Sequence, residues 1–203
     1  MPLNFIWDLD GTLLDSYGAI MKALEATYYH YQWEFDDKMI LAFILNESVG
    51  ALLKDKARLE NVDEQMVKSY YSTDLKTRDQ EIQLMSGARE ILDWTKERGI
   101  TNFIYTHKGD NTFSVLKQLD LESYFTEVVT GDSGFKRKPH PEALDYLIQT
   151  HHLDKNKTYY IGDRKLDMEA ALQAGIFSLN LKEVSQGKNQ KIKNLLDIKI
   201  RTL

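Results

Sequence analysis

Residues 4–16 read Asn-Phe-Ile-Trp-Asp-Leu-Asp-Gly-Thr-Leu-Leu-Asp-Ser. The short apolar run 5–7 predicts a buried strand, and it ends in two acids one residue apart, Asp8 and Asp10. Because residues i and i+2 of a strand share a face, both carboxylates lie on one side of the strand's carboxyl end. Two acids so close repel each other unless a cation or a shared proton lies between them. The pair lowers stability, so it indicates chemistry rather than packing.

Length and composition bound the class of protein. The 203 residues suffice for one medium domain with an insertion and a sizeable core. A net charge of −5 argues against a general nucleic-acid binder, and the lack of cysteine excludes disulfides, zinc–thiolate sites and thiol catalysis. No secretion signal or membrane-spanning run is visible. We therefore expect a cytoplasmic protein without membrane contact, a monomer by default with a homodimer as the alternative.

The hydrophobic pattern changes twice along the chain. Residues 16–81 carry only helical periodicity, whereas strands and helices alternate from residue 87 onward. Strands are predicted at 102–106, 127–129, 158–161 and 176–179, helices at 88–98, 112–119, 141–150 and 166–174, and a terminal helix with an edge strand in 188–203. Such alternation predicts an α/β fold, a Rossmann-like parallel sheet with helices on both faces. The expected core domain comprises 1–15 and 82–203, with an inserted all-helical domain of 16–81.

Polar residues follow several predicted strands at the point where each strand ends. Thr106, His107 and Lys108 follow one strand, and Gly162-Asp163 opens a segment that reaches Asp167 after another. Lys138 precedes a predicted helix. Ligands of open parallel sheets bind beyond the carboxyl ends of the strands. We therefore expect three acids, a hydroxyl and a lysine to meet at one rim of the sheet.

This rim resembles the haloacid dehalogenase superfamily of aspartate-nucleophile phosphatases, of the phosphoglycolate phosphatase-like kind. The matching residues are the signature Asp8-Leu9-Asp10-Gly11-Thr12, then Thr106, Lys138, and the pair Asp163 and Asp167. All four family motifs occur in family order, so the resemblance covers essentially the whole chain. It implies Mg²⁺-dependent hydrolysis of a small phosphorylated metabolite, a phosphate monoester, through an aspartyl-phosphate.

The resemblance also implies roles for the acids. Asp8 becomes the nucleophile, and Asp10 becomes the acid that protonates the leaving oxygen and then the base that activates water. Mg²⁺ would be held by the carboxylates of Asp8 and Asp163 and by the backbone carbonyl of Asp10. Oxygen ligands are those that Mg²⁺ prefers, and the ion keeps several waters, so few protein ligands are needed.

The resemblance gives roles to three further residues. Thr106 and Lys138 would bind the phosphoryl group, and Asp167 would hold Lys138 or a metal-bound water. His107 stands where the family commonly has Asn or Ser, and it is a further candidate near the phosphate. Three of these residues have a structural alternative. Thr106 is also an ordinary strand-end residue, His107 also suits loop stabilisation, and Asp167 also suits capping of the following helix.

The helical insertion matches the family's type 1 cap, which the resemblance makes the part that selects the substrate. Asn46, Glu47 and Ser48 join two predicted helices and occupy the position of the family's specificity loop. The structural alternative is a polar turn. Hinges are expected near 13–17 and 80–87, where a cap can open and close over a site.

Other functions stay open beside hydrolysis. A sugar-phosphate mutase of the same superfamily would share all core motifs and differ in returning the phosphoryl group to substrate. A receiver-like phospho-signalling module is a more distant alternative, since receivers are shorter and carry the phosphorylated acid on a later strand. The family's dehalogenases and phosphonate hydrolases are disfavoured because they lack the second acid that Asp10 provides.

Overall fold

A computed structural model describes residues 3–109 and 111–202, which form two compact units. The α/β unit comprises Met1–Asp15 and Gln83–Leu203, and the helical unit comprises Ser16–Ile82. Ile82, expected in the core domain, falls in the helical unit. Its side chain is buried, and its N–H donates to the Asp79 carbonyl at 3.1 Å, which ties it to the end of that unit.

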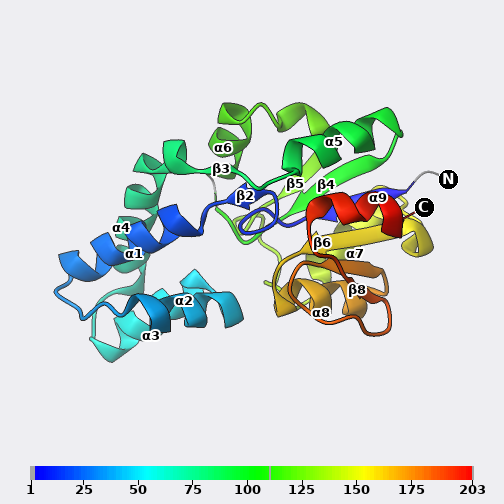
Figure 1. The fold of residues 1–203 in the computed structure, drawn as a ribbon. Coiled ribbons are helices and arrows are strands. Elements are labelled where there is room, and N and C mark those ends of the chain that lie inside the picture. Colours follow the sequence, from blue (N-terminus) through cyan, green and yellow to red (C-terminus); the bar gives the residue numbers. More distant parts are fainter. Residues whose placement is uncertain (1–2, 110, 203) are drawn as a thin grey trace. The chain divides into compact units, whose positions relative to one another are not determined.

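Six parallel strands form the main sheet of the α/β unit, in the order β5-β4-β1-β6-β7-β8 (Figure 1). Their bounds are β1 Asn4–Trp7, β4 Thr101–Tyr105, β5 Phe125–Val129, β6 Thr158–Gly162, β7 Phe177–Asn180 and β8 Asn189–Lys191. The strand that precedes Asp8 lies in the middle, with Trp7 opposite Ile104 of β4 and Ile161 of β6. The predicted α/β class and parallel sheet are confirmed, as is the edge strand in the tail.

One face of the sheet is covered by α7 (Glu142–Thr150) and α8 (Lys165–Ala174). Apolar side chains of both helices pack against Ile6, Phe103 and Tyr160, and all of these are buried. Alternation along β1 places Asp8 on the same side as Ile6. The packed face therefore continues, at the strand ends, into the rim where the acids lie.

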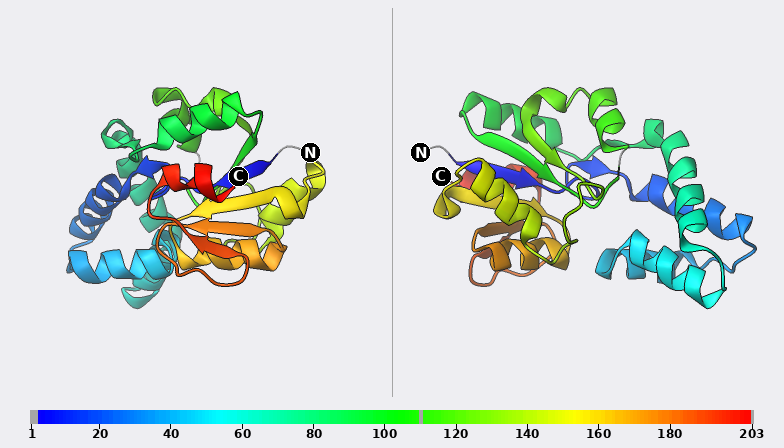
Figure 2. Two further views of the ribbon diagram at one scale, coloured as in Figure 1. Left: turned by 45° about the vertical axis from the view of Figure 1, so that its right-hand side comes forward. Right: turned by 180° about the vertical axis from the view of Figure 1, so that it is seen from behind.

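The opposite face is covered by α5 (Ala88–Glu97), and the short α9 (Ile198–Arg201) lies beside it (Figure 2). A chain of buried hydrogen bonds joins sheet and helix: the Trp7 indole donates to Asn102 at 2.9 Å, and Asn102 donates to Thr95 of α5 at 2.7 Å. This unit also contains α6 (Thr112–Gln118) and three 3₁₀ helices, Glu122–Tyr124, Lys155–Lys157 and Leu195–Asp197. Helices thus lie on both faces, as predicted.

Among residues 3–109 and 111–202, every helix is too short or too polar to span a membrane. The secondary structure of residues 16–82 consists of helices alone. Their bounds are α1 Tyr17–His30, α2 Asp37–Asn46, α3 Val49–Leu59, α4 Glu64–Thr77 and a 3₁₀ helix Asp79–Glu81. Asp63 accepts from the Met66 amide at 3.0 Å and so caps the start of α4. Met39 and Met66 fit the helical periodicity of residues 16–81 but are exposed, because neighbouring residues such as Ile40 and Val67 supply the buried faces of their helices.

The two expected hinges coincide with a feature that the sequence pattern did not predict. β2 (Leu14–Asp15) and β3 (Gln83–Leu84) pair antiparallel, and the Met85 amide donates to the Leu13 carbonyl at 2.9 Å. Strands of two residues are too short to leave an alternating pattern. The chain therefore leaves and re-enters the α/β unit through one paired ribbon.

Candidate active site

A sharp turn after β1 sets the two signature acids at the strand end. Gly11 has φ of +79°, a left-handed conformation that glycine adopts without steric cost. The turn lets the Leu9 carbonyl accept from the amides of residues 12–14 at 2.9–3.0 Å. The Asp8 amide still donates to the Ile161 carbonyl at 2.9 Å, so Asp8 stays within the sheet. Its side chain is buried, whereas that of Asp10 is partly exposed.

Lys138 lies in a buried polar centre between three acceptors. Its Nζ donates to Asp8 Oδ1 at 2.9 Å, to Asp167 Oδ1 at 2.7 Å and to the Tyr160 hydroxyl at 2.8 Å. An ammonium has three N–H donors, so all of them are used. Burial lowers the pKa of Lys138, but the charges of Asp167 and Asp8 outweigh it and raise the pKa overall. The lysine therefore stays charged beside the signature acid.

Two tyrosines support this ammonium, and sequence reasoning missed both. The Tyr160 hydroxyl accepts from Lys138 and donates to the Tyr105 carbonyl at 2.8 Å. The ring centres of Tyr105 and Tyr160 lie 5.2 and 5.5 Å from Nζ, within cation–π range. A signal was present, because Tyr160 pairs with Ile6 in the sheet and so shares the face that leads to Asp8. The aromatic content of β6 alone did not reveal the hydroxyl's partner.

Burial and neighbouring charges together raise the pKa of two of the buried acids, Asp8 and Asp163, and lower that of the third, Asp167. Burial raises the pKa of Asp8 to about 7, and the Lys138 charge offsets this only in part. Burial and the Asp167 charge raise the pKa of Asp163. Burial also acts to raise the pKa of Asp167, but the positive charges of Lys138 and Arg164 outweigh it, so the pKa of Asp167 is lowered. The charged form of Asp8 therefore destabilises the folded protein, and a nearby cation would reduce this destabilisation.

The carboxylates form a cluster that fits a divalent cation. One oxygen each from Asp8, Asp163 and Asp167 lie within 4.8 Å of one another. Asp8 Oδ2 is buried and has no hydrogen-bond partner among the described residues. Both oxygens of Asp167 are occupied, Oδ1 by Lys138 and Oδ2 by the Arg164 amide at 2.9 Å. Asp8 and Asp163 are therefore the fitting ligands, and Asp167 holds the lysine and caps α8.

Gly162 is required by the way Asp167 packs. A Cβ placed on Gly162 would lie 2.4 Å from the Asp167 Cβ, far inside van der Waals contact. Any side chain at this position would displace Asp167 and with it the acceptor of Lys138. A second lysine also reaches this region, since Lys182 Nζ donates to Asp163 Oδ2 at 2.7 Å. Nothing in the spacing of the chain indicated Lys182.

The loop after β4 carries the remaining polar groups. Thr106 is buried, and its Oγ1 accepts from the Lys108 amide at 3.1 Å. His107 Nε2 accepts from the Lys138 amide at 2.8 Å, and burial lowers the pKa of His107 well below its usual value. The ring is therefore neutral with its proton on Nδ1, which is buried without a partner among the described residues. Because Nε2 is occupied by the Lys138 amide, Nδ1–H is the ring donor with which His107 could contact a phosphate.

The three predicted specificity residues lie in the helical unit. Asn46 ends α2, Glu47 follows it, and Ser48 caps α3 by accepting from the Ala51 amide at 3.0 Å. Their role in substrate selection stays a prediction.

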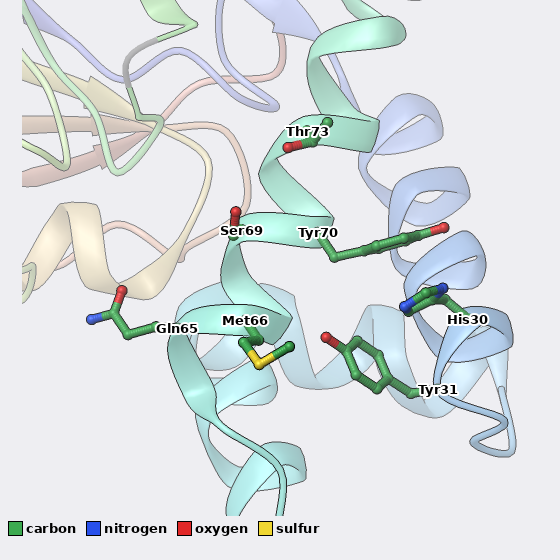
Figure 3. Close-up of a pocket in the computed structure, with 7 residues that line it drawn as sticks. All are labelled: His30, Tyr31, Gln65, Met66, Ser69, Tyr70 and Thr73. Atoms are coloured by element: carbon green, nitrogen blue, oxygen red, sulfur yellow. The ribbon is translucent and has the colours of Figure 1, made fainter.

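A separate shallow pocket of about 600 Å³ lies within the helical unit between the end of α1 and one face of α4 (Figure 3). It is lined by His30, Tyr31, Gln65, Met66, Ser69, Tyr70 and Thr73. His30 stacks on Tyr70 with ring centres 4.0 Å apart. The lining has no carboxylate and no lysine or arginine, so it offers none of the chemistry found at the rim.

The chain is similar to known proteins over most of its length. The sequence profile of the family described as haloacid dehalogenase-like hydrolase matches residues 5–181. The pyrophosphatase PpaX of Anoxybacillus flavithermus is 30% identical over 183 residues, covering 86% of this chain and 81% of that protein. A phosphoglycolate phosphatase of Vibrio parahaemolyticus is 27% identical over 191 residues, covering 86% and 81%. A haloacid dehalogenase superfamily hydrolase of subfamily IA from Geobacter sulfurreducens shares the fold, with a TM-score of 0.78, 20% identity and coverage of 100% and 97%.

Proposed function

The chain belongs to the haloacid dehalogenase-like hydrolases, and from this we propose that it is a Mg²⁺-dependent phosphatase acting on a small phosphate monoester. The observation that carries the proposal is the environment of Asp8. A buried carboxylate has one oxygen 2.9 Å from Lys138 Nζ and the other without a partner among the described residues, beside Asp163. Relatives named phosphoglycolate phosphatase and pyrophosphatase support a phosphate group as the target.

In the proposed reaction, an Asp8 carboxylate oxygen attacks phosphorus, and the bond to the leaving oxygen breaks. Asp10 gives its proton to the leaving oxygen and then takes one from the water that hydrolyses the aspartyl-phosphate. Asp8, Asp163 and the Asp10 carbonyl would hold Mg²⁺. The ion would supply positive charge that reduces repulsion between the Asp8 carboxylate and the phosphate. The raised pKa of Asp8 fits a carboxylate that needs such a cation.

Lys138 and Thr106 are the proposed donors to the phosphoryl oxygens, together with the Nδ1–H of His107. All three donors of Lys138 are already used, so a phosphoryl oxygen must replace one of its acceptors. Exchange at Asp8 suits the chemistry, because release of Lys138 from Oδ1 frees that oxygen to attack. Asp167 and the tyrosines would meanwhile keep the ammonium in place.

We further propose that residues 16–81 act as the substrate-selecting cap and that Asn46, Glu47 and Ser48 contact the substrate. The helical unit supports this by its position in the sequence, since it is inserted directly after the strand that carries Asp8. A monomeric cytoplasmic enzyme acting on a small metabolite, with no contact to nucleic acid or membrane, is the accompanying proposal.

The test is a panel of phosphorylated metabolites with MgCl₂, scored by free phosphate and by second-order rate constants. Asp8→Asn is expected to lose turnover while its circular dichroism stays native. Asp145→Asn, a partly exposed acid on α7, is the matched control and keeps activity. Native rates in Asp8→Asn would refute the assignment. Isomer conversion without phosphate release would favour a mutase, and a stable aspartyl-phosphate without turnover would favour signalling.

A further inference from the structure

Lys108 is a buried lysine whose ammonium has no hydrogen-bond acceptor among residues 3–109 and 111–202. Only 5% of the residue is exposed, and Nζ donates to nothing in the described part of the chain. Its ion pair is with Asp10 Oδ1 at 3.5 Å, longer than an ordinary N–H···O hydrogen bond, and neither atom has a hydrogen-bond partner among the described residues. By contrast, all three donors of Lys138 have acceptors within 2.9 Å.

The backbone around Lys108 is fixed on both sides. Its amide donates to Thr106 Oγ1 at 3.1 Å, and its carbonyl accepts from the Gly131 amide at 2.9 Å. The side chain therefore starts from a rigid loop at the end of β4. Burying an ammonium with its donors unused is unfavourable, and one ion pair at 3.5 Å leaves all three donors unsatisfied. Such a group is expected where an anion from outside the chain completes it.

The place of Lys108 indicates which part of a substrate that anion belongs to. In the proposed reaction the phosphoryl group lies between Asp8, which attacks, and Asp10, which protonates the leaving oxygen. Lys138 contacts the carboxylate of Asp8, whereas Lys108 stands beside that of Asp10. Because attack and departure are in line, a group near Asp10 belongs to the leaving group rather than to the transferred phosphate.

We propose that Lys108 binds an anionic group, a carboxylate or a phosphate, carried by the leaving group close to the scissile oxygen. The inference rests on the proposed phosphatase function and adds a substrate class to it: esters whose leaving group is itself negatively charged. Lys108 is then a specificity-determining residue. The competing explanation is that Lys108 acts only through Asp10, by orienting its carboxylate for every substrate alike.

The test compares two isosteric substrates, 2-phosphoglycolate and its neutral amide, in wild type, Lys108→Met and Lys108→Arg. The ratio of their kcat/KM values cancels any effect of Lys108 on Asp10, which is common to both substrates. Wild type is expected to favour the carboxylate by about ten- to hundred-fold, the range for a buried charge-assisted hydrogen bond. Lys108→Met should bring the ratio near one, and Lys108→Arg should retain most of it. Lys117→Met, an exposed lysine on α6, is the matched control.

Pyrophosphate and methyl phosphate repeat the comparison for a phosphate in the leaving group, so the two anion types are distinguished. An unchanged carboxylate-to-amide ratio in Lys108→Met, with both rates lowered equally, would overturn the inference in favour of action through Asp10. Calorimetry in the Asp8→Asn background decides the matter without turnover. There, Lys108→Met should weaken phosphoglycolate binding about ten-fold or more and leave amide binding unchanged. If wild type cleaves no ester but this difference appears, the phosphatase proposal fails and the anion site stands; equal binding overturns the site.

Discussion

Replacing Asp8 by Asn is expected to stabilise the metal-free protein. The pKa of Asp8 is about 7 in the fold, compared with 3.8 as its ordinary value, because burial disfavours the charged carboxylate. The folded state therefore binds this proton more tightly than the unfolded state. The resulting stabilisation is fully present below pH 3.8 and is lost as the pH rises through about 7. Asn mimics the neutral carboxyl and can still accept from Lys138.

The magnitude follows from the shift. About three pKa units correspond to about 4 kcal/mol at about 1.4 kcal/mol per unit. Above pH 7 the wild type carries this full cost. At pH 5 it carries only about 1.7 kcal/mol, because the folded carboxyl is then protonated and only the unfolded one ionises. Lys138 and Asp167 respond to the same charge, which reduces the net effect of the substitution. We therefore expect the free energy of unfolding of Asp8→Asn to exceed that of wild type by about 2–4 kcal/mol at pH 8.

The assay is urea unfolding in EDTA at pH 5, 6, 7 and 8, with equal m-values required of the proteins compared. Asp145→Asn also removes one acidic group and serves as the control, with no comparable gain in its free energy of unfolding. The difference between Asp8→Asn and wild type should grow with pH and level off above 7. An Asp8→Asn protein no more stable than wild type at pH 8, or a difference that does not change with pH, would refute the electrostatic reasoning.

Three further outcomes are expected. Tyr160→Phe should lower kcat about ten-fold with a smaller change in KM, because Lys138 loses one acceptor. Tyr159→Phe on the same strand is the control and should not lower kcat. Equal effects of the two substitutions would contradict the role of the Tyr160 hydroxyl. Gly162→Ala should cost about 1–3 kcal/mol by overpacking against Asp167, measured by urea unfolding, whereas Gly18→Ala, with no atom within 4 Å of the added carbon, should be neutral or stabilising. MgCl₂ should raise the melting temperature of wild type, and much less that of Asp163→Asn; equal shifts would exclude Asp163 as a ligand.

The sheet was predictable because its information is local. Short apolar runs such as 5–7 alternate with helical periodicity, and parallel strands end at one edge, so Asp8 and Asp163 were expected at the same rim. The pairing of β1 with β6 then makes them neighbours. The contact of Lys138 with Asp167 was one of three predicted roles for that acid, and it is present together with the capping role. Family order in the motifs placed the lysine at this rim although its segment is not a strand.

The support around the site was not predictable in the same way. The hydroxyl of Tyr160 and the ammonium of Lys182 reach their partners through side-chain directions that spacing does not fix. That the donors of Lys108 find no acceptor among the described residues emerges only from the folded structure, because an unsatisfied group is a property of the packed protein. In the helical unit, Met39 occupies a position that fits an apolar stripe yet is exposed. Periodicity marks a face of a helix but not how wide the buried part is.

The central claim, that Asp8 carries the phosphoryl group, is tested most directly by trapping the intermediate. The enzyme is mixed with substrate and MgCl₂, quenched in acid within milliseconds and reduced with borohydride, which converts an acyl phosphate to an alcohol. Mass spectrometry of the N-terminal tryptic peptide then locates the change. We predict reduction at residue 8 alone, absent from Asp8→Asn. Phosphate release with no reduced residue at position 8, or reduction at Asp10 or Asp163 instead, would contradict the account.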